Sequence, residues 1–136
     1  MTNLTLSHCF LTVHDQDAAL AFYTDVLGLE PRADVQLGDM RWLTVGPEDQ
    51  SVEIGLLPPG APFSPPEDVT AALEITAKGL TPGVIFVTPD VAATFEDLRS
   101  KGAEVVQEPI DQPYGRDCAF RDPSGNHLRF TQLPKG

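Results

Sequence analysis

The sequence predicts an α+β fold built from two similar halves. Strand-like runs and amphipathic helical runs alternate along its 136 residues. The same succession of strand, capped helix and further strands occurs twice. The length also suits one domain with its own apolar core, since domains most often have about 100–150 residues.

The first half begins with an apolar, β-branched run at 8–13 that predicts a strand. Asp15 then follows as a helix N-cap, the next apolar positions have helical spacing, and Gly28 ends that helix. Residues 40–45 predict a strand that ends at a Gly-Pro turn, and residues 51–57 predict the last strand of this half.

The second half follows a proline-rich segment at 58–66, which predicts a linker, and a helical stretch at 67–78. A strand at 84–87 precedes Asp90, which caps a helix that ends at Gly102. Three more strands are predicted, at 104–107, 117–121 and 127–133.

The two halves correspond residue by residue, which indicates an internal duplication. Asp90 follows Asp15 by 75 positions, and Arg129 follows Glu53 by 76 positions. We therefore expect a single domain over 1–136. Its first module covers about 4–57, its linker and helix cover 58–82, and its second module covers about 83–134.

The charge and the cysteine content exclude several classes of partner. A formal net charge of −11 repels phosphate backbones and anionic membranes, so we expect no nucleic-acid or membrane partner. The same field favours cationic ligands, although it also serves plain solubility. Two cysteines, no basic-apolar leader and no long apolar run predict a reduced cytoplasmic protein without a disulfide framework.

Two segments resemble a known family. His8–Asp15 with Ala21–Leu29 is similar to the opening strand and "FY..VLG" helix end of the glyoxalase/bleomycin-resistance/dioxygenase group, the vicinal oxygen chelate superfamily. Pro113–Gly115 with Phe120–Asn126 is similar to its "DP.GN" hairpin. The resemblance implies two βαβββ modules whose curved sheets enclose a small-molecule cavity. It also implies homodimers, which many members form.

Strand alternation combined with this resemblance predicts which side chains face the cavity. Met40 and Trp42, with Phe10, are expected to form a thioether and aromatic wall for a flat ligand, and ordinary core packing is the alternative. Arg41 and Arg116 either fix an anionic group or lie on the surface. The predicted cavity residues are His8, Phe10, Thr12, Met40, Trp42, Glu53, His127 and Arg129.

The resemblance also implies a divalent metal held by His or Glu from the first and last strand of each module. His8 and Glu53 match two such positions, whereas Gly83 and Arg129 stand at the other two. Glycine offers no side-chain ligand and arginine cannot coordinate a cation. We therefore expect no cofactor and a pairing of Arg129 with Glu53. In the alternative, His127 or a substrate oxygen completes a metal site.

These observations predict a metal-free protein that binds a small molecule, such as an antibiotic, similar to the bleomycin-resistance branch. The alternative is a metal-dependent enzyme, either a lyase/isomerase like glyoxalase I or an extradiol-type dioxygenase. A metal-free enzyme with Glu53 or His8 as base is a third possibility. No catalytic residue is assigned from the sequence, and Cys118 is expected to be structural because no base accompanies it.

Overall fold

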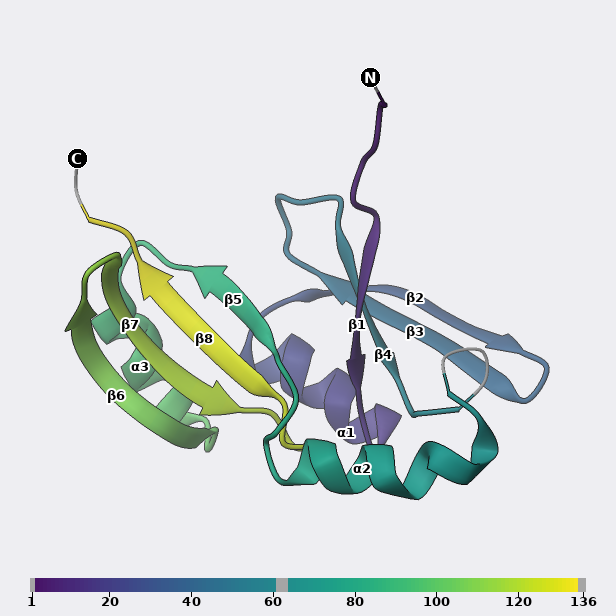
Figure 1. Cartoon of the computed structure of the whole chain (residues 1–136). Helices are drawn as coiled ribbons and strands as arrows, with labels where there is room; N and C mark the ends of the chain where they lie inside the picture. Colours follow the sequence, from purple (N-terminus) through teal and green to yellow (C-terminus); the bar gives the residue numbers. More distant parts are fainter. Residues whose placement is uncertain (1, 61–63, 135–136) are drawn as a thin grey trace. The chain divides into compact units, whose positions relative to one another are not determined.

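The computed structural model describes residues 2–60 and 64–134 of the chain. Its internal contacts cluster into two compact units, Met1–Leu73 (unit 1) and Glu74–Gly136 (unit 2). Each unit carries one open four-stranded sheet (Figure 1). The boundary falls inside helix α2 (Val69–Ala77), which follows a short 3-10 turn, η2 (Pro66–Asp68). Residues 61–63 of the predicted linker lie outside the described residues.

Unit 1 has the order strand, helix and three strands. Asp15 caps α1 as predicted, since its carboxylate accepts a hydrogen bond from Ala18 N at 3.0 Å. The helix passes into a π-helical turn before Gly28, whose φ is +73°. The sheet order is β1-β4-β3-β2, with β1 parallel to β4. Its elements are β1 (His8–Thr12), α1 (Gln16–Ala21), η1 (Phe22–Val26), β2 (Glu30–Leu37), β3 (Met40–Gly46) and β4 (Glu53–Leu57).

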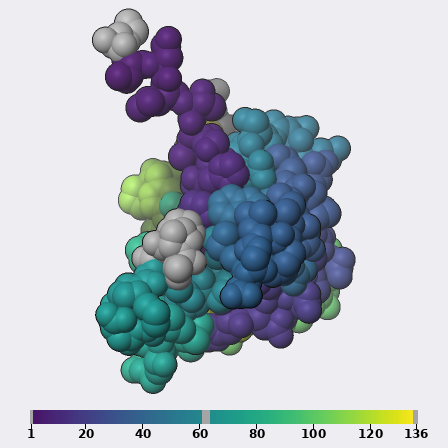
Figure 2. Space-filling model, turned by 90° about the vertical axis from the view of Figure 1, so that its right-hand side faces the viewer, coloured from purple at the N-terminus to yellow at the C-terminus, as the bar shows by residue number. Residues whose placement is uncertain are grey.

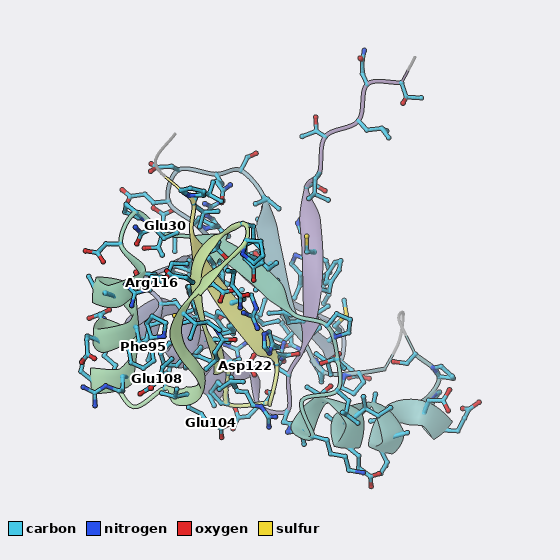
Figure 3. The ribbon with its side chains drawn as sticks, turned by 60° about the vertical axis from the view of Figure 1, so that its left-hand side comes forward. Glu30, Phe95, Glu104, Glu108, Arg116 and Asp122 are labelled. Carbon is cyan, nitrogen blue, oxygen red and sulfur yellow. The ribbon has the colours of Figure 1, made fainter. Side chains whose placement is uncertain are left out.

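Unit 2 repeats this order in its own sheet, β5-β8-β7-β6. Asp90 caps α3 by accepting a hydrogen bond from Ala93 N at 3.1 Å. Phe95 projects from α3 toward the sheet (Figure 3), and its ring lies 5.5 Å from that of Phe120. The elements are β5 (Val84–Val87), α3 (Val91–Ser100), β6 (Glu104–Gln112), β7 (Gly115–Arg121) and β8 (His127–Gln132).

The predicted βαβββ repeat is therefore confirmed, with one strand missed and one underestimated. The residue pattern predicted no strand at β2, whose residues are mostly exposed and lack a clear apolar alternation. Strand β6 continues five residues beyond the predicted end at Gln107, and its pairing with β7 is irregular there. Edge strands with few buried residues give a weak sequence signal, because one-sided burial is what creates alternation.

Each sheet buries the face that carries its helix, and the predicted packing residues lie there. Leu11, Val13, Ile54 and Leu56 are buried in unit 1, and Leu128 and Phe130 are buried in unit 2. On the opposite face, which we call the open face, Phe10 of unit 1 and Ile85 of unit 2 keep exposed side chains. The residues before β1 extend away from the sheet (Figures 1 and 2), and Leu4 and Leu6 are exposed.

The strand register corrects the predicted correspondence of the last strands. His8 pairs with Glu53 in unit 1. In unit 2, Arg129 pairs with Ile85, which places His127 beside Gly83. Because the helix caps put Gly83 at the position of His8, His127 rather than Arg129 is the counterpart of Glu53. Arg129 lies two residues farther along β8 than the chain offset predicted.

Candidate ligand-binding site

Three aromatic side chains meet on the open face of the unit 1 sheet. His8 and Phe10 lie two residues apart on β1, so they project from the same face. Their rings are nearly parallel, with centroids 6.3 Å apart. Trp42 of β3 lies 5.7 Å from each of them. We call these three residues the aromatic cluster; the aromatic part of the predicted wall is therefore assembled.

Gly55 gives the aromatic cluster its shape. It pairs with Phe10 across β1 and β4, and a Cβ atom at Gly55 would lie 2.4 Å from a carbon of the Phe10 ring. The ring therefore rests directly on the β4 backbone, where any larger residue would lift it. Phe10 nevertheless keeps 42% of its surface exposed. Exposed aromatic rings that are held in place by the backbone in this way offer a stacking surface for a flat molecule.

The carboxylate of Glu53 lies beside this cluster and is held by one donor. Thr44, which is fully buried, donates from Oγ1 to Glu53 Oε1 at 2.5 Å. The second oxygen, Oε2, lies 3.8 Å from His8 Nε2, which is beyond hydrogen-bonding distance. The Glu53 side chain is 27% exposed. The role of Thr44 was not predicted from the sequence, because it depends on the register of β3 against β4.

The predicted metal ligands of unit 1 lie side by side, without a third His, Cys, Asp or Glu grouped with them among the described residues. His8 and Glu53 supply two donors, and the described residues contain no group of three or more His, Cys, Asp or Glu with metal-binding geometry. Zinc sites in proteins use three or four protein ligands. At Gly83, a Cβ atom would lie 1.6 Å from the His127 carbonyl oxygen, so no histidine fits there. Completion of the site by His127 stays a prediction.

The open face of unit 2 carries a different polar centre, around Asp117 of β7. Its side chain is fully buried and accepts hydrogen bonds from Tyr114 Oη at 2.6 Å and Gln107 Nε2 at 2.9 Å. Arg129 Nη1 lies 2.5 Å from Asp117 Oδ2. Within unit 2 the partner of Arg129 is therefore Asp117, and its predicted pairing with Glu53, which lies in unit 1, stays a prediction. The role of Asp117 was not predicted from strand alternation, since only the β7–β8 register brings this residue to Arg129.

Electrostatics follow from these contacts. Burial alone would raise the pKa of Asp117, but hydrogen bonds from Tyr114, Arg129 and Gln107 outweigh it and lower that pKa to about 2. The pKa of His127 is lowered by burial and by the positive charges of Arg129 and Arg121. Asp117 therefore stays ionised at neutral pH as the counter-ion of Arg129.

The remaining predicted residues are dispersed. Met40 lines a cavity of about 330 Å³ in unit 1, together with Gln16, Arg41 and Leu57. Arg41 is held by Asp17 and Asp34, at 2.7 and 2.9 Å, so its charge is neutralised on the helix side. Thr12 ends β1 opposite Leu57.

The two cysteines and Arg116 take no part in the clusters described above. Cys118 is fully buried, and burial raises its pKa to about 11, which agrees with the predicted structural role. Cys9 is half-buried, and both thiols are free. Arg116 is half-exposed and lies 3.9 Å from Asp111.

Comparison with known proteins settles the family. The profile described as the Glyoxalase/Bleomycin resistance protein/Dioxygenase superfamily matches residues 5–130. The chain belongs to this superfamily. It is 34% identical to the protein YurT of Bacillus subtilis (strain 168) over 121 residues, which are 88% of this chain and 92% of YurT.

Solved structures agree with the fold over nearly the whole chain. UcmS2 is 42% identical with a TM-score of 0.88, over 96% of this chain and 98% of that one. TnmS3, an antibiotic binding protein from Streptomyces sp. CB03234, is 27% identical with a TM-score of 0.80, over 98% and 99%. One of the solved structures that this chain resembles is thus described as an antibiotic binding protein.

Proposed function

We propose that the protein binds a small, flat organic molecule of antibiotic type and that it does so without a metal. The aromatic cluster of His8, Phe10 and Trp42 carries this proposal, because its rings meet on an open sheet face at 5.7 to 6.3 Å. The similarity to the antibiotic binding protein TnmS3 supports it. The two-donor set of His8 and Glu53 supports binding without a metal.

Trp42 provides a direct test, because it is the only tryptophan of the chain. A panel of planar aromatic compounds is titrated while tryptophan emission and the melting temperature are recorded. Binding quenches Trp42 and raises the melting temperature. By calorimetry, Trp42→Leu should lose about fivefold in affinity, since ring stacking contributes about 1 kcal/mol beyond area burial. The control Ile75→Ala removes an exposed apolar side chain on α2 and should change nothing.

The enzyme reading remains the second candidate, because His8 and Glu53 do lie side by side. Elemental analysis of the protein purified without chelators separates the two. Less than about one metal per ten chains, with no activity gained on adding nickel, zinc, manganese or iron, is expected. One metal per chain would overturn the proposal.

We also propose that the protein works as a cytoplasmic homodimer. The exposed apolar side chains of Ile85 and Val87 on the edge strand β5 support association, because such surface is usually covered. Two free thiols suit a reducing compartment. No helix in the described part of the chain is long and apolar enough to cross a bilayer. Light scattering should give twice the chain mass of 14.7 kDa.

A further inference from the structure

We infer that the unit 1 site selects ligands that carry a positive charge next to a flat aromatic system, with Glu53 as the charge-recognising group. The inference rests on the proposed function, since it concerns the same aromatic cluster. It adds the chemical class of the ligand, and it names Glu53 as the residue that binds the charged group of that ligand.

Glu53 is placed to act on a ligand that stacks on the cluster. It pairs with His8 and lies two residues from Gly55, on which the Phe10 ring rests, so its side chain projects from the same face. The Thr44 hydroxyl holds one oxygen of this carboxylate by donating a hydrogen bond to it. Among the described residues nothing donates a hydrogen bond to Oε2, the oxygen that lies 3.8 Å from His8 Nε2. A ligand N–H donor would complete its coordination.

The other charges near this face are already compensated. Arg32 lies over Gly46 and donates to the carbonyls of Pro47 and Gln50 at distances of 2.5 and 2.8 Å. Its Nε lies 3.4 Å from Glu30. Arg41 is paired with two carboxylates on the helix side of the sheet. Glu53 therefore leaves the open face with one formal negative charge when His8 is counted as neutral.

Aromatic faces and a carboxylate attract the same kind of group. A cation over the face of Trp or Phe is stabilised by the ring quadrupole. A charge-assisted hydrogen bond to a carboxylate is about twice as strong as a neutral one. The net charge of −11 acts in the same direction at long range. Anionic ligands meet the opposite forces, and neutral ones meet neither.

The test uses three probes with one ring system: naphthalen-2-ylmethylammonium, naphthalen-2-ylmethanol and 2-naphthoate. Each is titrated into the full chain and followed by Trp42 emission. The ammonium should bind about tenfold tighter than the alcohol, and the carboxylate should bind more weakly than both. In Glu53→Gln the ammonium should lose this advantage while alcohol binding stays within about twofold.

The control Glu48→Gln makes the same change in net charge at an exposed position of the same unit. It should keep the ammonium advantage. An equal loss in both variants would show that the long-range field alone selects cations, and would overturn the inference. The wild type gives a second check in about 1 M NaCl, where the Debye length is about 3 Å. If the tighter binding of the ammonium probe disappears there, the inference is overturned as well. This second measurement needs no variant.

Failure of the inference and failure of the proposed function look different. If the alcohol binds and quenches Trp42 but the ammonium binds no better, the result supports the aromatic site and contradicts charge selection by Glu53. If none of the three probes changes Trp42 emission or the melting temperature, the proposed site itself is wrong, and the inference fails with it.

Discussion

Unit 1 and unit 2 repeat one backbone but use their carboxylates in opposite ways. On the open face of unit 1, Glu53 accepts one described hydrogen bond, from Thr44, and its side chain is 27% exposed. On the open face of unit 2, Asp117 is fully buried and bound by Tyr114, Gln107 and Arg129. A saturated carboxylate stabilises its own surroundings, whereas one with an unfilled oxygen can bind something else.

The same contrast holds for the apolar side chains. In unit 1 the open face presents the aromatic cluster of His8, Phe10 and Trp42. In unit 2 the residues at the positions of His8 and Phe10 are Gly83 and Ile85, and the Ile85 side chain is 69% exposed. The two units thus share caps and strand order, which depend on backbone geometry, and differ in their exposed faces, where packing does not constrain the side chains.

Among the substitutions that test this difference between the two units, the largest effect is expected at Asp117. Asp117→Ala leaves Arg129, which is only 23% exposed, without its counter-ion and removes the acceptor of Tyr114. We expect a loss of about 3 kcal/mol in the free energy of unfolding, measured with urea, because breaking a buried pair on one side is costly. Glu53→Ala in unit 1 should cost under about 1 kcal/mol. Equal costs would refute the assigned difference.

A second substitution tests the backbone contact of unit 2. In Gly83→Ala the new methyl would lie 1.6 Å from the His127 carbonyl oxygen, so β5 and β8 must separate. The expected cost is about 2 kcal/mol, seen as a lower melting temperature. Gly38→Ala, also at a glycine but with nothing within 4 Å, is the control and should cost about 1 kcal/mol through its φ of +61°.

The acid stability of the two units should also differ. The pKa of Asp117 is lowered from its ordinary value of 3.8 to about 2 in the folded protein. A lowered carboxyl pKa stabilises the folded state above pH 3.8, and this stabilisation is lost as the pH falls toward 2. It amounts to about 2 kcal/mol. The stability gap between wild type and Asp117→Asn should therefore shrink between about pH 5 and pH 2; a constant gap would contradict this.

The smallest effect concerns the two thiols, which lie in different units. Cys118 is fully buried in β7 with a pKa raised to about 11, whereas Cys9 of β1 is half-buried. A neutral disulfide reagent should modify Cys9 first and Cys118 only as unit 2 opens. Mass spectrometry of Cys118→Ala and Cys9→Ala identifies each step. Faster reaction at Cys118 would mean that its side of unit 2 is less well packed than described.

Local signals made most of the fold predictable from the sequence. Asp15 and Asp90 cap helices as expected, because an N-cap depends on contacts within four residues. The buried alternation of Leu11, Val13 and Leu128 is equally local in origin. Strand β2 was not predicted, because its residues are mostly exposed and show no alternation of apolar and polar side chains. The superfamily resemblance implied the strand that the residue pattern left out of the first module.

The candidate site was predicted only in part. His8, Phe10, Trp42 and Glu53 were found because each lies on a strand whose alternation is readable. Thr44 and Asp117 were missed, since their roles depend on which residue of the neighbouring strand they face. The place of Arg129 was two residues off for the same reason. Register is a long-range property, and a shift along one strand leaves the local sequence pattern unchanged.

The contact between Gly83 and the His127 carbonyl has an evolutionary consequence. A substitution that introduces a histidine at position 83 would place its side chain where the neighbouring backbone already lies. Any lineage that carries this strand pairing would have to move β5 before a ligand there became useful. As long as this strand pairing persists, position 83 can contribute no side chain to the unit 2 sheet face.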